Sequence, residues 1–226
     1  MLRALLIASS IAAAAATFAP GPAAADQDYV AKGMSVYAPR PVPAVFGKVA
    51  AVSPTYHGHG SAAPSVDSTG VRQKAQQMLS DGRPRRLTIR NANTGTDVTA
   101  EFWRDGSYDT WAMARFSQLL GDHHERDAAS IDPRLIDLLW ILAGLSGRDT
   151  VLVTSGYRSH HTNAQLVGGA SDSLHVSGRA LDIAIPGVAV QVVAGQAAAL
   201  AWGGVGEYRG DGHVHVDVGS FRYWQQ

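Results

Sequence analysis

The sequence predicts an α+β fold in which helices pack on a small antiparallel sheet. Two amphipathic helical patterns lie in the middle of the folded part, and short β-branched segments dominate the C-terminal third. Helices followed by an antiparallel set of strands are typical of the α+β class. With 226 residues, 46% of them hydrophobic and 17% charged, the chain can form one compact domain and a tail.

The N-terminus has the pattern of a secretory signal peptide. A basic residue lies among the first three, an apolar run covers 4–18, and Ala23 and Ala25 have the spacing of a cleavage site. We therefore expect residues 1–25 to be removed, and we expect no stable membrane insertion afterwards. An uncleaved anchor is the alternative, which the short run and its flanking prolines disfavour.

Composition restricts the partners and the chemistry. Nineteen basic residues balance nineteen acidic ones, and the tight cluster of Arg83, Arg85 and Arg86 is too small for the footprint of a nucleic-acid binder. The absence of cysteine excludes disulfides, thiolate metal sites and a cysteine nucleophile. Any metal must therefore be bound by His, Asp or Glu, and an exported chain without disulfides favours the bacterial periplasm.

Residues 26–85 are rich in proline, alanine, serine and glycine and have no sustained periodicity. We expect a mostly disordered linker with at most a short helix near 71–79. His57 and His59 lie in this segment. We interpret them as solvated loop residues, because flexible glycine-rich surroundings cannot preorganise metal ligands.

The folded domain is expected to span 86–226 and to begin with a hairpin. Its strands are 86–91 and 97–103, joined by an Asn-Thr-Gly turn. Two helices follow, the first capped by Asp109 and the second by Asp132, which precedes a proline suited to the first helical position. Both helices have one apolar face, which predicts that they contribute to the hydrophobic core rather than to a catalytic site.

The C-terminal part alternates short strands and helices. The pattern predicts a strand at 150–156, a brief helix from Thr162, a strand at 179–185, a helix at 189–201, a strand near Val205 and a strand at 213–218.

The strand HVHVDV carries a candidate site. Because side chains alternate across a strand, His213, His215 and Asp217 share one face while three valines occupy the other. The same alternation in RALDIAI leaves Asp182 between two alanines on a face opposite Leu181 and its apolar neighbours. Small residues beside the carboxylate are what a site that needs open space requires.

If these two strands are neighbours, His175, Asp182 and His215 can converge on one metal ion. Two histidines and a carboxylate around Zn²⁺, with one position open to water, are typical of a catalytic zinc site. Such a metal lowers the pKa of water to about 7, and His213 is then placed to act as general base. A single histidine on a strand is usually only half-buried surface, so the prediction depends on the conjunction of both strands.

Arg158 follows a predicted strand end in the stretch SGYRS. It can bind a substrate carbonyl or an oxyanion, or it can be a solvated arginine. The neighbouring His160 and His161 are expected on the surface, because nothing in the pattern orients them.

Several blocks of the chain resemble one known family. VTSGYRSHHTNAQL, SLHVSGRALDIAIPG and HVHVDVGSFRYW occur in the order found in the YcbK-type bacterial peptidoglycan peptidases. These belong to the zinc peptidase fold group of the D-alanyl-D-alanine carboxypeptidases, the lysostaphin-like enzymes and the Hedgehog-type proteins. The resemblance covers about 86–226.

The resemblance implies one Zn²⁺ bound by His175, Asp182 and His215, with His213 as the catalytic base and Arg158 on the substrate backbone. It implies that peptidoglycan stem peptides are the substrate, with cleavage between D-alanine and diaminopimelate as the commonest activity. Other branches of the fold group have an acid three residues before the last histidine ligand, where this chain has a glycine. Asp211 is therefore the alternative base.

Two other functions remain open at this point. One is a carboxypeptidase that trims terminal D-alanine, and the other is a metal-stabilised module that binds peptidoglycan without cutting it. We expect a monomer that binds no nucleic acid. The sequence does not decide between DD and LD bonds.

Overall fold

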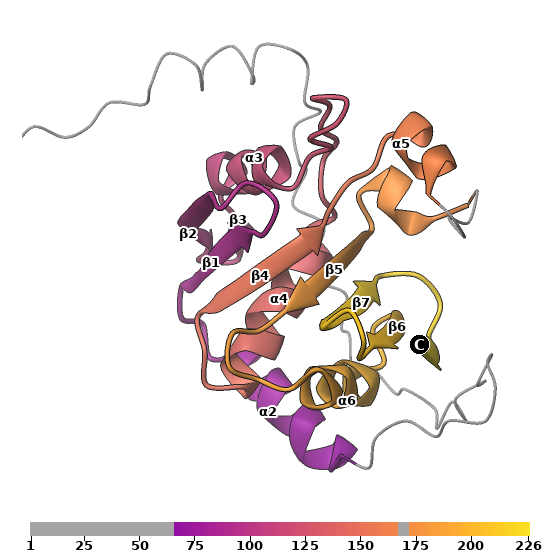
Figure 1. Ribbon diagram of the computed structural model, residues 1–226. Helices are drawn as coiled ribbons and strands as arrows, with labels where there is room; N and C mark the ends of the chain where they lie inside the picture. Colours follow the sequence, from indigo (N-terminus) through magenta and orange to yellow (C-terminus); the bar gives the residue numbers. More distant parts are fainter. Residues whose placement is uncertain (1–65, 167–171) are drawn as a thin grey trace, which may run out of the picture. The chain divides into compact units, whose positions relative to one another are not determined.

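The computed structural model describes residues 66–166 and 172–226 (Figure 1). The signal peptide, His57, His59 and most of the expected linker therefore lie outside the described residues. The elements in chain order are α2 (Ser68–Ser80), β1 (Arg85–Asn91), β2 (Asp97–Arg104), β3 (Ser107–Tyr108), α3 (Thr110–Leu119), α4 (Pro133–Leu145), β4 (Thr150–Ser155), α5 (His160–Gln165), the 3₁₀ helix η1 (Leu174–Ser177), β5 (Ala180–Ala184), α6 (Val190–Leu200), β6 (Gly204–Tyr208), β7 (His213–Asp217) and β8 (Arg222–Gln225).

All eight strands form one sheet in the order β3-β2-β1-β4-β5-β7-β6-β8. The pairs β1/β4 and β6/β8 are parallel, and the other neighbouring pairs are antiparallel. The α+β class is confirmed, but the expected small antiparallel sheet is wrong. Parallel neighbours arise from long crossovers, and β1 reaches β4 only after a hairpin and two helices. A local sequence pattern does not reveal such a pairing.

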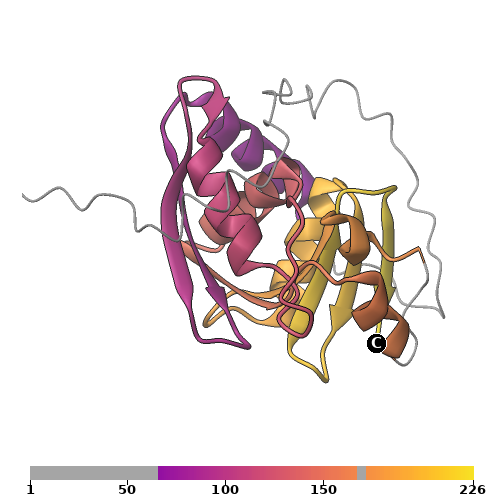
Figure 2. The ribbon, with the colours of Figure 1, turned by 90° about the horizontal axis from the view of Figure 1, so that it is seen from above.

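The helices α2, α4 and α6 group along one face of the sheet (Figure 2). Helix α4 begins as predicted, with Asp132 accepting a hydrogen bond from the Arg134 backbone and Pro133 at the first position. Nearly all of its apolar side chains are buried in one continuous core. Valines of β7 and Leu181 and Ile183 of β5 enter the same core, which leaves the opposite face of these strands free for polar residues.

Helix α2 is longer than the expected segment 71–79 and belongs to the packed domain. Asp67 caps it through hydrogen bonds from the backbone of Thr69 and Gly70. It contacts α6 and α4, its Ala75 is fully buried, and Arg72 Nε donates to Ala199 O at 2.6 Å. Within the described residues, the packed part therefore includes α2, which precedes the expected domain start at residue 86.

A buried ion pair connects the first hairpin to the helices. The Arg85 guanidinium lies 2.6 Å from Asp137 on α4, and the rings of Trp103 and Trp140 contact it at 4.1 and 5.3 Å. Tyr108 also donates to Asp137. Since a buried charge is stable only with its partner, this contact fixes β1 against α4.

The remaining elements agree with the pattern to within a few residues. Helix α5 begins at His160 rather than at Thr162, because Ser159 Oγ accepts a hydrogen bond from the Thr162 backbone and caps it. The strands β3 and β8 and the helix η1 were not predicted. Among the described residues, no helix is both long enough and apolar enough to span a membrane.

Candidate metal centre

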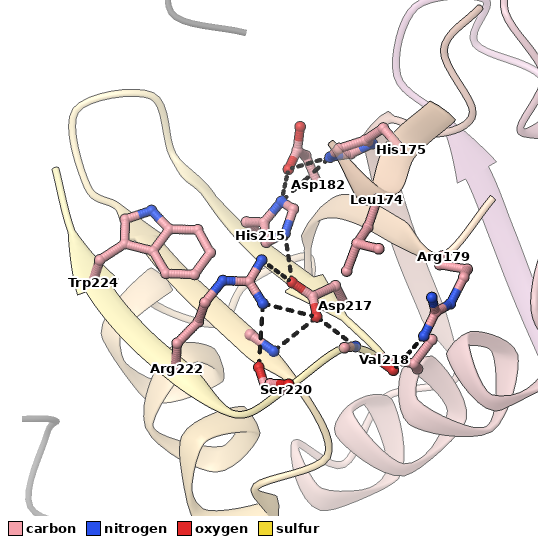
Figure 3. Close-up of polar contacts among 12 residues, drawn as sticks. Leu174, His175, Arg179, Asp182, His215, Asp217, Val218, Ser220, Arg222 and Trp224 are labelled. Carbon is pink, nitrogen blue, oxygen red and sulfur yellow. Dashed lines mark hydrogen bonds and ion pairs between the residues drawn. The ribbon is translucent and has the colours of Figure 1, made fainter. Parts of the chain in front are cut away.

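Three side chains from η1, β5 and β7 meet on the polar face of the sheet (Figure 3). Asp182 and His215 are direct cross-strand partners in the antiparallel β5/β7 pair. His175 comes from η1, which ends at Gly178 in the left-handed conformation, φ 64°. A side chain at Gly178 would overlap the Ser130 carbonyl, so glycine allows η1 to turn tightly into β5.

The three donor atoms form a compact triangle. His215 Nδ1 lies 3.0 Å from Asp182 Oδ1, His175 Nε2 lies 3.4 Å from the same oxygen, and the two nitrogens are 3.3 Å apart. Donors that share one tetrahedral Zn²⁺ at about 2.0–2.1 Å are separated by about 3.3–3.4 Å. The donor set and its spacing therefore fit a zinc ion with three protein ligands. It is the one such group among the residues that the structure describes.

Each histidine is oriented by a hydrogen bond from its other nitrogen. His175 Nδ1 donates to the carbonyl of Gly156 at 2.7 Å. A carbonyl only accepts, so Nδ1 carries the proton and Nε2 is free to bind a metal. His215 Nε2 donates to Asp217 Oδ2 at 3.2 Å, which leaves Nδ1 for the metal. Such partners fix the tautomer and the ring plane of metal-binding histidines.

Asp217 connects the centre to the end of the sheet. Besides His215, it accepts hydrogen bonds from the backbone of Gly204 at 2.9 Å and of Gly219 at 2.7 Å, and Arg222 forms an ion pair with it at 2.7 Å. Burial raises its pKa, but these donors together lower the pKa of Asp217 to about 2. Asp217 thus both orients a histidine and satisfies the backbone donors at the strand end.

The electrostatics of the triangle favour a cation. Burial opposes the charge on Asp182, yet hydrogen bonds and attraction from His175 and His215 hold the pKa of this carboxyl well below its usual value. The pKa of His215 is raised, because contacts with Asp182 and Asp217 outweigh its burial. The carboxyl of Asp182 therefore keeps its negative charge to well below its usual pKa, and the position between the donors attracts positive charge.

Arg158 lies against the outer oxygen of the same carboxylate. Its Nη2 donates to Asp182 Oδ2 at 2.7 Å, and its Nε donates to Ser155 Oγ at 2.9 Å. Its backbone N–H also donates to the carbonyl of His175. The arginine expected on the substrate thus contacts a metal-ligand candidate. Of its three guanidinium nitrogens, only Nη1 has no hydrogen bond to another described residue.

His213 shares the polar face of β7 with His215, as the alternation predicts. Its ring stacks on Tyr208 with a centroid distance of 4.6 Å and an interplanar angle of 17°. At about 3.4 Å per residue, it lies about 7 Å along the strand from His215. Asp211, the alternative base, is exposed in the turn before β7, and His160 and His161 are exposed as expected.

Other contributors to the site were not predicted. Asp122 accepts hydrogen bonds from the backbone of His124 at 2.9 Å and of Ser159 at 2.8 Å, and so anchors the loop before α5 next to Arg158. Trp224 lies 5.2 Å from His215, ring centroid to ring centroid. Alternation in the stretch RYWQ would place Trp224 opposite the buried Tyr223, but only pairing of β8 with β6 brings it to the centre. No sequence pattern indicates that the carbonyl of Gly156 accepts a hydrogen bond from His175.

Comparisons with known proteins identify the family of the chain. The family model Peptidase_M15_2, described as peptidoglycan L,D-endopeptidase MepK, matches residues 79–224. The MepK proteins of Escherichia coli (strain K12) and of Shigella flexneri, both named peptidoglycan L,D-endopeptidase, are 39% identical over 151 residues, which are 65% of this chain and 83% of theirs. A probable MepK of Haemophilus influenzae is 35% identical over 154 residues, 66% of this chain and 83% of its own. No solved structure matches the chain significantly. The resemblance to bacterial peptidoglycan peptidases is confirmed.

Proposed function

We propose that this chain, which belongs to the Peptidase_M15_2 family of peptidoglycan L,D-endopeptidases, hydrolyses peptide cross-links in peptidoglycan with the aid of one bound Zn²⁺. The observation that carries the proposal is the triangle of His175 Nε2, Asp182 Oδ1 and His215 Nδ1, with sides of 3.0–3.4 Å. A structural zinc site has four protein ligands, whereas three leave a position for water and substrate. The triangle therefore supports a catalytic role.

The chain's own residues supply the rest of the reaction. When bound in such a site, zinc lowers the pKa of water toward 7 and polarises a carbonyl. His213 takes the proton of the attacking water and returns it to the leaving amine, since it lies on the same face of β7 as His215. Stacking on Tyr208 restricts the plane in which the His213 ring can accept that proton. Asp211 is less suited, because its exposed turn does not orient it.

Arg158 holds Asp182 in position. By binding Oδ2 and Ser155 Oγ together, its guanidinium leaves Oδ1 for the metal. We assign its remaining Nη1 a second role, in which it donates to a carbonyl oxygen of the substrate or to the developing oxyanion.

The names of the relatives favour a bond between an L- and a D-centre. This differs from the D-alanine–diaminopimelate bond that the resemblance alone implied. We assign the same L,D bond class to this chain, because the matched residues include all three donors, Arg158 and His213. The expected signal peptide places the protein in the periplasm, where its substrate lies, and we propose that it acts as a monomer.

The decisive experiment is a digest of purified sacculi with and without chelator, followed by separation of the muropeptides. We expect the zinc-loaded protein to convert cross-linked dimers into monomers, and we expect chelator or His213→Ala to prevent it. Release of free alanine would instead identify a carboxypeptidase. Binding to sacculi with unchanged dimers would identify a module without catalysis, and either result would refute the proposal.

A further inference from the structure

A row of register partners crosses the sheet at the metal centre. Asp182 on β5 pairs with His215 on β7, His215 pairs with Gly206 on β6, and Gly206 pairs with Trp224 on the edge strand β8. The next pair on the same face of β6 and β7 is Tyr208 and His213. We call Tyr208, His213 and Trp224 the aromatic wall. Its residues lie on β6, β7 and β8, whereas only small alanines flank Asp182 on β5.

Trp224 is held in one orientation. Its ring lies so close over Gly206 that a side chain at this position would overlap it. Its Nε1 donates to the Tyr208 hydroxyl at 3.1 Å, and its ring is tilted by 46° against His215 at 5.2 Å. Figure 3 shows the indole beside Arg222 and His215. A glycine beneath the ring and a hydrogen bond at its edge therefore keep the indole next to a candidate ligand.

These rings are not part of the buried core. Their strand neighbours Val214 and Tyr223 belong to the core, whereas the wall residues lie on the opposite face and are only half-buried. A half-exposed indole at the rim of the centre has its remaining face available to a ligand, and aromatic residues in such places supply much of the binding free energy.

The charge beside Trp224 is already paired. Arg222, whose guanidinium carbon lies 5.2 Å from the Trp224 ring centroid, forms its ion pair with Asp217. The indole of Trp224 therefore offers apolar contact rather than a charge. The face of an aromatic ring carries partial negative charge, and C–H bonds of a saturated chain pack well against it.

We propose that the aromatic wall binds the aliphatic side chain of the diamino acid that forms the cross-link, at the residue next to the scissile bond. This inference rests on the proposed function and names the part of the substrate that the wall recognises. Peptidoglycan has two saturated parts that could pack on the wall, the sugar and the side chain of the diamino acid. The short distance of Trp224 from the donor triangle decides between them. Trp224 is 5.2 Å from His215, whereas a sugar two or more residues away along a stem lies at least about 7 Å from the bond. The methylene chain of a diamino acid fits this short distance.

The test is steady-state cleavage of cross-linked peptide dimers, with and without their sugars, by the zinc-loaded protein. For Trp224→Ala we expect KM to rise about tenfold on both dimers, with kcat changed by less than about twofold. Trp224→Phe should restore part of the affinity, because it keeps an aromatic face. Trp111→Ala is the matched control, since Trp111 is exposed on α3, which packs on β2 far along the strand order. The zinc content of all variants is measured in parallel.

A second substrate isolates the contact. In a dimer cross-linked through diaminopropionate, which has a single methylene, parent and Trp224→Ala should have nearly the same KM. An unchanged KM for Trp224→Ala on the natural dimer, a KM effect that vanishes when the sugars are removed, or zinc loss in Trp224→Phe would each overturn the inference. If the parent cleaves no dimer, the proposed function fails. The inference is then judged by the dissociation constants for the same dimers, in which the same tenfold contrast is expected.

Discussion

Asp182 and His215 face each other across the antiparallel strands β5 and β7, with the carboxylate Oδ1 3.0 Å from the imidazole Nδ1. Their separation is set by the register of the sheet rather than by a flexible loop. A slip of one residue in either strand would turn that side chain into the core, so the apolar faces of β5 and β7 also preserve the polar pair. The candidate metal centre is in this sense a product of core packing.

The donor triangle predicts that His175→Ala abolishes stoichiometric zinc binding. Two remaining ligands cannot hold the ion against water, so we expect zinc content to fall from about one per chain to a small fraction. Elemental analysis after dialysis measures it. His161→Ala serves as the control, because His161 is exposed on α5 and lies outside the triangle. Equal zinc in His175→Ala and the parent would refute the ligand assignment.

The contact between Asp217 and His215 predicts that replacing Asp217 weakens zinc binding without abolishing it. Asp217→Asn keeps the shape of the side chain but removes the negative charge that His215 Nε2–H contacts. We expect zinc affinity to fall by about 10–100-fold, as is typical when the hydrogen-bond partner of a metal-binding histidine is replaced. Competition with a chromophoric chelator gives the dissociation constant. Asp211→Asn, an exposed change of the same type, should leave that constant unaltered, and an unaltered value for Asp217→Asn would contradict the orienting role.

Arg158 can be tested without changing the local charge. Arg158→Lys retains the cation but loses the planar fork that joins Ser155 Oγ to Asp182 Oδ2. We expect zinc affinity to drop about tenfold, because Asp182 is then free to rotate. If zinc affinity stays constant while KM for a cross-linked dimer rises, Arg158 contacts only the substrate and the positioning role is wrong.

Asp122 predicts a pH-dependent contribution to stability. Burial raises the pKa of Asp122, but hydrogen bonds from the Thr162 hydroxyl and from the backbone of Ser159 and His124 lower it to about 2. A carboxyl with a lowered pKa stabilises the fold at pH values above its unfolded pKa, and this stabilisation is lost as the pH falls through the folded value. Asp122→Asn should therefore reduce the free energy of unfolding at pH 7 by about 2 kcal/mol.

The difference between Asp122→Asn and the parent should narrow as the pH falls from about 4 to about 2. Urea unfolding with chelator present measures it, so that metal binding adds no pH dependence of its own. Asp105→Asn is the control, since Asp105 is exposed in a turn at φ 50°, where asparagine is well tolerated. A difference that stays constant over this pH range would show that the charge of Asp122 is not involved.

The sequence alone located the three donors and the element types around them. Period-two alternation placed Asp182 and His215 on polar faces opposite valines and isoleucines, because a strand has only two faces and the core claims one. Caps at Asp109 and Asp132 located two helices, because these bonds form within a few residues of the chain. The motifs identified the family.

Only the tertiary structure decided which strands are neighbours, and hence what surrounds the donors. The parallel pairs β1/β4 and β6/β8, the contact of Arg158 with Asp182, and the position of Trp224 beside His215 all join residues far apart in the chain. Such contacts depend on the packing of the whole core, and local sequence periodicity does not predict them. Local geometry determined which residues are polar and on which face, and long-range packing determined which of them meet.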